Sequence, residues 1–123
     1  KQKFSFMQNF PNVQFYDYTK HFNRMIKYLR GQLPANYHLT FSRNEKNDFK
    51  ATQVLKAGGN VAVVFRDKLP AKYKGFKVIN GDLHDLRFLD KKNVVVGLKE
   101  KLTLDEDTGK LQRNYSGFVV DLK

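Results

Sequence analysis

Two carboxylates and an imidazole stand within four residues of one another in the segment Asp82-Leu83-His84-Asp85. Oxygen and nitrogen ligands of this kind suit Mg²⁺ or Mn²⁺, and with Asp17 they would form the site of a metal-dependent nuclease or hydrolase. The neighbouring Arg87 would then hold a phosphate group of the substrate.

A metal site needs several ligands that converge at defined distances, and one His-Asp pair does not define such a geometry. The alternative interpretation is a polar turn between two strands, in which Asp82 makes a local hydrogen bond to the backbone. We favour this alternative, and we expect neither a bound metal nor a cofactor. The catalytic candidates are Asp17, Asp82, His84 and Asp85, and we expect catalysis to be absent or feeble.

The densest basic stretch of the chain lies between residues 66 and 77, where Lys and Arg alternate with aromatic residues. Phosphate contacts from cations, combined with stacking on aromatic rings, are how proteins hold single-stranded nucleic acid. The alternative is a solvated loop whose aromatic residues belong to the core. We expect nucleic acid to contact Arg66, Lys68, Lys72, Tyr73, Lys74 and Lys77.

A second basic surface follows from helical periodicity. Apolar residues recur at helical spacing from Phe22 to Leu33, which leaves the cations between them on the opposite face. Such a face is usually the solvated side of an amphipathic helix, so we expect it to add less to binding. Its residues are Lys20, Arg24, Lys27 and Arg30.

The whole chain carries a formal net charge of +11 over 123 residues. Residues 1–101 hold 20 Lys and Arg against 8 Asp and Glu, a charge of +12, whereas residues 102–123 hold 3 against 4, a charge of −1. The positive field therefore belongs to the body of the protein. A field of this sign attracts polyanions and speeds encounter with them, which favours DNA or RNA as the partner.

Two further observations exclude classes of protein. The chain has no cysteine, which excludes disulfide scaffolds, thiolate zinc sites and cysteine-held iron–sulfur clusters within it. No apolar run approaches the roughly 20 residues that span a bilayer. The basic N-terminus is not followed by a sustained apolar region, so we expect no signal peptide and no membrane partner.

The elements that position these residues alternate in the first half of the chain. Strands are predicted at 13–18, 37–42 and 60–65, and the last of these is apolar throughout, as in a strand buried on both faces. One predicted helix is capped by Thr19 and ends at Gly31. Another starts at Ser42 with capping-box spacing, runs to about Ala57 and is stopped by Gly58-Gly59.

The second half contains short strand patterns at 76–80, 86–89, 93–98 and 117–122, without room for a long helix before residue 98. The predicted fold class is therefore α/β: a βαβαβ parallel half followed by short strands, part of an open or incomplete barrel-like sheet. We expect one basic domain over residues 1–123, with 102–115 as an exposed insertion.

Ligands of parallel α/β sheets bind beyond the carboxyl ends of the strands. This rule selects residues that follow each predicted strand. They are Asp17, Tyr18, Lys20, Ser42, Arg43 and Arg66 in the first half, and Asp82, Asp90, Lys99 and Lys101 in the second.

Several segments of the sequence, taken together, are similar to those of a known protein family. The chain resembles a family of phage and mobile-element proteins that is distantly similar to the mycobacteriophage "gene product eighty-eight" group. The resemblance covers residues 10–123 approximately. The segments are Phe15-Tyr16-Asp17-Tyr18-Thr19-Lys20, Leu33-Pro34-Ala35-Asn36-Tyr37-His38-Leu39-Thr40-Phe41-Ser42, Gly59-Asn60-Val61-Ala62-Val63-Val64-Phe65-Arg66, Gly81-Asp82 with His84-Asp85-Leu86-Arg87-Phe88-Leu89-Asp90, Val94-Val95-Val96-Gly97-Leu98-Lys99 and Ser116-Gly117-Phe118-Val119-Val120.

The resemblance implies a phage or mobile-element origin, the cytoplasm of the host cell as location, and part of a barrel-like fold. Family members carry an additional N-terminal segment with a further strand. The sequence lacks a counterpart of that strand, so we do not expect a closed barrel. The Cys-rich clusters of distant relatives, which point to radical chemistry, have no counterpart in this chain.

The predicted function is a phage or mobile-element accessory protein that binds nucleic acid through its basic surface. The alternatives are a phage-encoded inhibitor that binds a host defence protein, and a remnant of a metal-dependent nuclease or hydrolase. The partner is thus expected to be nucleic acid, with a host or phage protein as the alternative.

Overall fold

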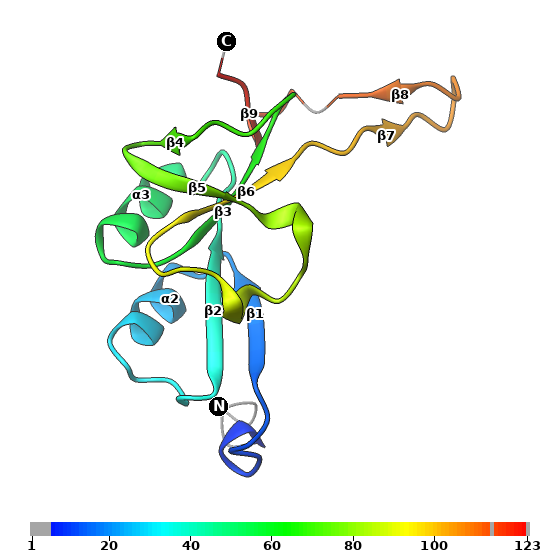
Figure 1. Cartoon of the computed structure of the whole chain (residues 1–123). Helices are drawn as coiled ribbons and strands as arrows, with labels where there is room; N and C mark the ends of the chain where they lie inside the picture. Colours follow the sequence, from blue (N-terminus) through cyan, green and yellow to red (C-terminus); the bar gives the residue numbers. More distant parts are fainter. Residues whose placement is uncertain (1–5, 114, 123) are drawn as a thin grey trace.

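The structure is a computed structural model that describes residues 6–113 and 115–122. Six strands form one path through a sheet, in the order β1-β2-β3-β6-β5-β4, and β9 pairs with β3 beside that path (Figure 1). The elements in chain order are β1 (Phe15–Thr19), α2 (Phe22–Leu29), β2 (Tyr37–Ser42), α3 (Asp48–Lys56), β3 (Val61–Phe65), β4 (Lys72–Tyr73), β5 (Phe76–Asn80), the 3₁₀ turns η1 (Gly81–Leu83) and η2 (Arg87–Leu89), β6 (Val95–Lys99), β7 (Thr103–Leu104), β8 (Leu111–Gln112) and β9 (Val119–Val120).

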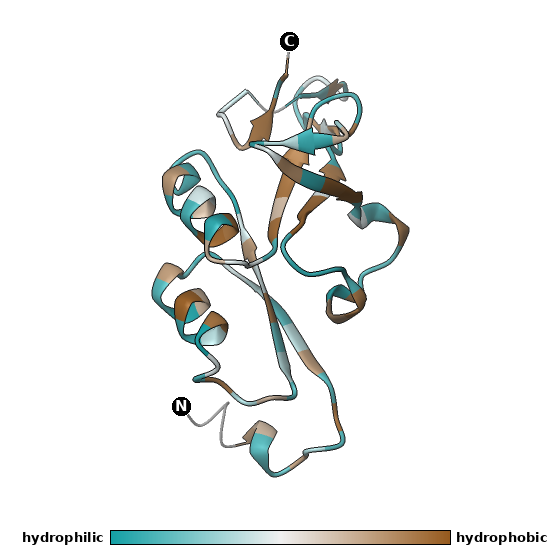
Figure 2. Ribbon diagram, turned by 60° about the vertical axis from the view of Figure 1, so that its left-hand side comes forward, coloured by the Kyte–Doolittle hydropathy of each residue, from teal (hydrophilic) through white to brown (hydrophobic). Residues whose placement is uncertain are grey.

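The predicted fold class is confirmed. β1, β2, β3, β6 and β5 are parallel to their neighbours, and only β4 adds an antiparallel strand at the edge. The chain steps from β1 to β2 to β3 in one direction, so right-handed crossovers place α2 and α3 on the same face of the sheet. The segment with η1 and η2 lies on the opposite side (Figures 1 and 2). The described strands form an open sheet and do not close into a barrel.

β3 is the strand to which most of the sheet is attached. One of its edges pairs with β6 over the full length, from Val61 opposite Val95 to Phe65 opposite Lys99. The other edge is shared, because β2 pairs with Val61 and Ala62 whereas β9 pairs with Val64 and Phe65. The apolar run that predicted a strand buried on both faces is thus paired on both edges as well.

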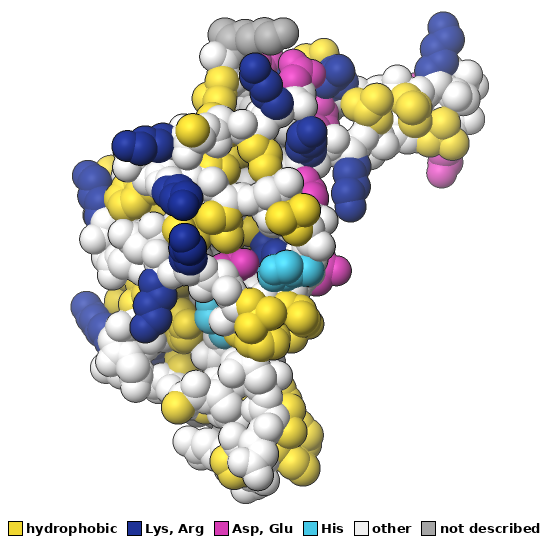
Figure 3. Space-filling view, viewed as in Figure 1, with side chains coloured by type: hydrophobic (Ala, Val, Ile, Leu, Met, Phe, Trp, Pro, Cys, Tyr) yellow, Lys and Arg dark blue, Asp and Glu magenta, His cyan; other side chains and the backbone are white. Residues whose placement is uncertain are grey.

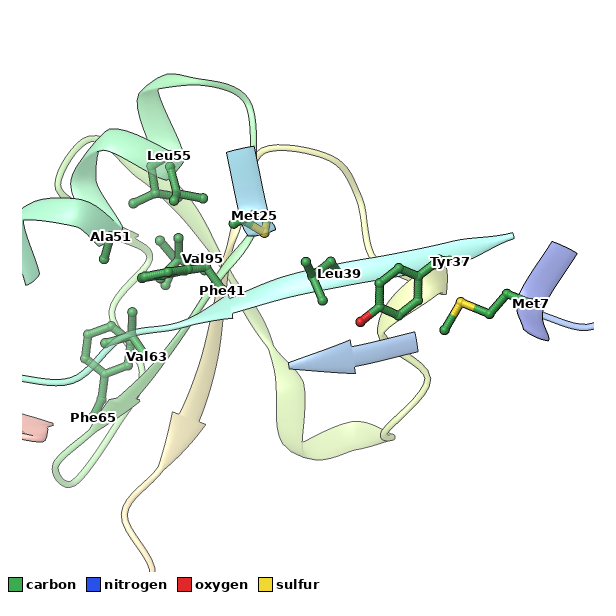
Figure 4. Packing of buried hydrophobic residues seen from close by; sticks show 12 residues of the cluster. Met7, Met25, Tyr37, Leu39, Phe41, Ala51, Leu55, Val63, Phe65 and Val95 are labelled. Carbon is green, nitrogen blue, oxygen red and sulfur yellow. The ribbon is translucent and has the colours of Figure 1, made fainter. Parts of the chain in front are cut away.

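The main core lies between the sheet and the two helices. Alternate residues of β2 point toward the helices, and Tyr37, Leu39 and Phe41 are each at most 2% exposed. Met25 of α2 and Leu55 of α3 pack against them, and Figure 4 shows how these side chains lie along the strand. Each large apolar side chain that is fully buried contributes about 1.5–3 kcal/mol.

The start of α3 differs from its predicted position. Ser42 is the last residue of β2, and α3 begins only at Asp48. The side chains of Asn44 and Asn47 accept hydrogen bonds from each other's backbone N–H, at 2.8 Å and 2.7 Å. β2 continues to pair with β3 through Ser42, so the helix does not start at this residue as the capping-box pattern predicted. The side chains of Asn44 and Asn47 instead hold the turn that precedes α3.

Two other predictions were also wrong at the local level. Thr19 ends β1, and its hydroxyl accepts a hydrogen bond from the His21 N–H at 3.0 Å instead of capping the helix that begins at Phe22. Residues 86–89, predicted as a strand, contain the 3₁₀ turn η2, whose Arg87 side chain is buried. In a strand, alternate side chains point to opposite faces of a sheet. The Arg87 side chain instead turns into its own loop, which requires a different path of the backbone.

The segment predicted as an exposed insertion forms a projecting hairpin, which we call the arm (residues 103–112). β7 and β8 pair antiparallel, with Leu104 opposite Leu111. Both leucines are more than 60% exposed, and Figure 1 shows the arm extending away from the sheet. None of the described helices has the length and apolar character that crossing a membrane would require.

Tyr37 provides a test of how the helix-facing core is held. Its hydroxyl donates to Asp17 Oδ2 at 3.0 Å. Burial, together with the hydrogen bond and the charge of Asp17, raises the pKa of Tyr37 to about 12. The folded protein therefore retains this proton at a pH where the unfolded chain has lost it, so Tyr37 makes the free energy of unfolding fall as the pH rises from about 10 to 12.

We expect the Tyr37→Phe variant to lose about 1 kcal/mol at neutral pH, from the missing hydrogen bond. Above pH 10 its stability should fall less steeply than that of the wild type, by about 1–3 kcal/mol in total. Urea unfolding at a series of alkaline pH values measures both effects. Tyr115→Phe, at a side chain that is 78% exposed, is the control and should follow the wild-type curve. Identical alkaline slopes for all three proteins would contradict the prediction.

Candidate functional site

The structure divides the predicted basic cluster into structural and exposed cations. Arg66 belongs to the first kind, because only 8% of its side chain is exposed. Its guanidinium pairs with Glu100 at 3.2 Å and with Asp121 at 3.1 Å, and it lies 4.4 Å from the centre of the Tyr115 ring. These contacts join the end of β3 to the segment after β6 and to the chain that follows β9.

Lys74 and Tyr73 anchor the β4–β5 hairpin. Lys74 Nζ lies 2.7 Å from Asp48 Oδ2 and 2.7 Å from Thr52 Oγ1, both on α3. Burial opposes the charge of Asp48, but hydrogen bonds from Lys74 and Arg43 outweigh it and hold the pKa of Asp48 below its ordinary value. The Tyr73 ring packs against Phe65 at 5.2 Å, so this aromatic residue is used within the fold.

The remaining cations of this stretch are exposed, and we call Lys68, Lys72 and Lys77 the hairpin lysines. Lys72 of β4 stands directly opposite Lys77 of β5. Like charges at directly opposite positions of an antiparallel pair destabilise it. None of the ion pairs within the described part of the chain involves the three hairpin lysines.

The second predicted surface is also exposed. The helix cations Lys20, Arg24, Lys27 and Arg30 all lie on the solvent side of α2 or next to it, as helical periodicity predicted. Figure 3 shows Lys and Arg side chains gathered over the β4–β5 hairpin and down the side of the molecule that carries the helices. The hairpin lysines and the helix cations are thus both accessible to a large partner.

The four catalytic candidates do not form one cluster. Tyr18 and Tyr16 lie on the face of β1 that looks toward η1 and η2, so the intervening Asp17 points to the opposite face, where Tyr37 binds it. Asp82 Oδ2 accepts the Lys99 N–H at 2.9 Å. Among the described residues, no three His, Asp or Glu side chains converge as a metal site requires.

Sequence reasoning missed the structural role of Arg87, which is 1% exposed. Its Nη2 donates to the Gly81 carbonyl at 3.2 Å and to the His84 carbonyl, and its Nε lies 3.3 Å from Asp90 Oδ2. Burial raises the pKa of Asp90, although the charge of Arg87 partly offsets it. Arg87 is therefore enclosed by its own loop and is not placed to hold a substrate phosphate.

A hollow of about 600 Å³ lies at the carboxyl ends of the parallel strands, and we call it the strand-end hollow. Tyr18 of β1, Val64 of β3 and Leu98 of β6 contribute to it, and the chain after β6 closes one side. Its full lining is Tyr18, Val64, Gly81, Asp82, Asp85, Leu98, Lys99, Glu100, Lys101, Thr103, Phe118 and Val119. The strand-end rule selected Tyr18, Asp82, Lys99 and Lys101 from the sequence, and the hollow brings these four together.

The fold can now be compared with known proteins. A family model described as Gene product 88 matches residues 2–121. The chain belongs to the Gene product 88 family. This confirms the family resemblance drawn from the sequence and places the chain among phage proteins. No curated protein and no solved structure matches the chain.

The ion pair between Arg87 and Asp90 lets us predict the free energy of unfolding of variants of this Gene product 88 family member. Removing the cation in Arg87→Met leaves Asp90 without its partner, and the free energy of unfolding should fall by about 3–5 kcal/mol. The double variant Arg87→Met/Asp90→Leu removes both charges and should recover part of that stability, although the carbonyls of Gly81 and His84 still lose their donor. Denaturant unfolding at neutral pH measures each variant.

Lys110→Met is the matched control, because Lys110 is an exposed cation of the arm that takes part in none of the ion pairs of the described residues. This substitution should cost less than about 1 kcal/mol. If the double variant at Arg87 and Asp90 were no more stable than Arg87→Met alone, the ion pair would not be what holds the loop.

Proposed function

We propose that this protein is a phage accessory protein that binds nucleic acid, and that the hairpin lysines make the main phosphate contacts. The observation that carries the proposal is the pairing of Lys72 with Lys77 across two short strands. Two lysines at facing positions weaken a hairpin, and nothing in the fold compensates for them among the described ion pairs. A phosphate backbone placed between them would supply the missing counter-charge.

The arrangement of charge supports this proposal over a purely solvated surface. The turn of the hairpin is fixed, because Lys74 holds it to α3 and the adjacent Tyr73 packs against Phe65. The hairpin lysines are thus presented on a rigid element, which lowers the entropy cost of binding. The helix cations extend the positive surface on the same side of the molecule (Figure 3).

The net positive charge of residues 1–101 also favours a long polyanion as the binding partner. Residues 1–101 carry a charge of +12, and the fold uses only part of it in internal ion pairs. If about five phosphates are bound, the logarithm of the affinity should fall against the logarithm of salt concentration with a slope of about −3 to −5.

Two triple variants test which surface binds. Lys68→Ala/Lys72→Ala/Lys77→Ala should weaken binding to single- and double-stranded oligonucleotides and reduce the salt slope by about one unit for each phosphate that the variant no longer binds. Lys20→Ala/Arg24→Ala/Lys27→Ala removes the same charge from the helix surface and should have the smaller effect. Fluorescence anisotropy over a range of salt concentrations measures both, with circular dichroism to show that each variant is folded.

A larger effect of the helix variant would move the interface to α2. Wild-type binding that does not depend on salt, or no binding at low salt, would overturn the proposal altogether. In that case stable co-purification of a host protein that survives nuclease treatment would favour the inhibitor alternative.

A further inference from the structure

The strand-end hollow has an apolar floor built from adjacent strands. Val64 of β3 lies opposite both Leu98 of β6 and Val119 of β9, so three apolar side chains stand next to one another in the sheet. They lie on the face opposite to that of Val63 and Phe65, which are buried in the core under the helices. An apolar floor of this kind suits a ring rather than an ion.

An aromatic wall and two carboxylates adjoin this floor. The Tyr18 side chain, at the end of β1, is 47% exposed and is one of the residues that line the hollow. Burial raises the pKa of Tyr18 above the ordinary tyrosine value, and a tyrosine with that ordinary value is already uncharged near neutral pH. Asp82 and Asp85 come from the loop around η1, and Asp82 is fixed there by the Lys99 N–H.

The loop that supplies the carboxylates is itself held rigidly. Buried Arg87 donates to the carbonyls of Gly81 and His84, on either side of Asp82 and next to Asp85. Gly81 is required at this position, because a Cβ there would lie 2.6 Å from Arg87 Nη1 and 2.5 Å from Val96 Cγ1. The two carboxylates are therefore presented on a fixed frame.

We propose that the strand-end hollow binds a nucleotide whose base carries an amino group. The base would lie on the floor against the Tyr18 ring, and Asp85 would accept a hydrogen bond from the exocyclic amine. Lys101, where the chain leaves β6, would face the phosphate. The hollow has the volume of a small-molecule site, since such sites span about 300–1,000 Å³.

The nucleotide can come from two sources, a free mononucleotide or one residue of a nucleic-acid strand. The hollow is formed by residues other than the hairpin lysines, so binding of a free mononucleotide does not depend on the proposed function. The second source does rest on it, because the strand would have to be held by the basic surface.

Titration of the whole chain with GMP, AMP, CMP and UMP, followed by nuclear magnetic resonance and calorimetry, tests the site. The three amino-bearing nucleotides should bind about tenfold more tightly than UMP, because a hydrogen bond to a charged group is worth at least that factor. Shifts should centre on Tyr18, Leu98 and Phe118. Asp85→Asn should remove most of the preference over UMP, and Tyr18→Ala should weaken all four.

The chain offers a matched control for each variant. Tyr16 lies on the same strand and face as Tyr18 but packs against Phe88, and Asp107 is an exposed carboxylate at the tip of the arm. Tyr16→Ala and Asp107→Asn should bind like the wild type. Equal weakening in Tyr16→Ala and Tyr18→Ala, an unchanged preference in Asp85→Asn, or no binding of any mononucleotide would overturn the proposal.

Oligonucleotides distinguish the two sources. If a strand supplies the base, a polyuridine oligonucleotide with one guanine should compete with GMP and bind more tightly than polyuridine alone. If the free nucleotide is the ligand, that oligonucleotide should not displace GMP. The triple variant of the hairpin lysines should bind GMP normally in either case, so the failure of the proposed function and the failure of this site give different results.

Discussion

The pairing of β3 along both edges is the constraint on which the rest of the structure depends. β2 occupies only the first half of one edge, because the chain must leave the sheet after Ser42 to form α3. Arg43 fills the place where β2 departs, since its guanidinium donates to the carbonyls of Gly117 and Phe118 and to Asp48. One side chain thereby aligns β9 with the free half of β3 and ties it to α3, and that alignment completes the floor of the strand-end hollow.

The protein uses part of its positive charge to connect segments of the fold to one another. Arg43, Arg66, Lys74 and Arg87 each join segments that are distant in the sequence or close a loop on itself. Buried or half-buried pairs of this kind are sensitive to the removal of either partner, whereas exposed pairs are worth little. The large net charge therefore has two roles: some cations define how the open sheet is assembled, and the others, such as Lys72 and Lys77, remain available to an external anion.

The order of strands and helices could be predicted because it follows from local patterns. The apolar run before Phe65 and the helical spacing around Met25 are properties of short windows, and their elements lie where expected. The roles of Arg87 and Lys74 could not be predicted in this way, because each depends on a carboxylate brought near by tertiary structure or by an unexpected turn. Asn44 and Asn47 are a different case, because their mutual bonds form a local turn that the capping-box interpretation of Ser42 passed over. Within the hollow, the rule that ligands bind beyond strand ends selected Tyr18 and Asp82. Asp85 was singled out only as a metal-ligand candidate, because the 3₁₀ turns that bring it to the hollow were not predicted.

The arm has a consequence for which changes of sequence this chain can tolerate. Its base is fixed, because Arg113 pairs with Asp67 and Glu100. Beyond that base the two strands pair mainly with each other, and an isolated hairpin contributes little to the stability of a fold. Residues between Leu104 and Leu111 can accordingly be lengthened, shortened or replaced without disturbing the pairing of β3. Changes at the tip would thus alter what the arm presents to its surroundings while the sheet and the hollow remain intact.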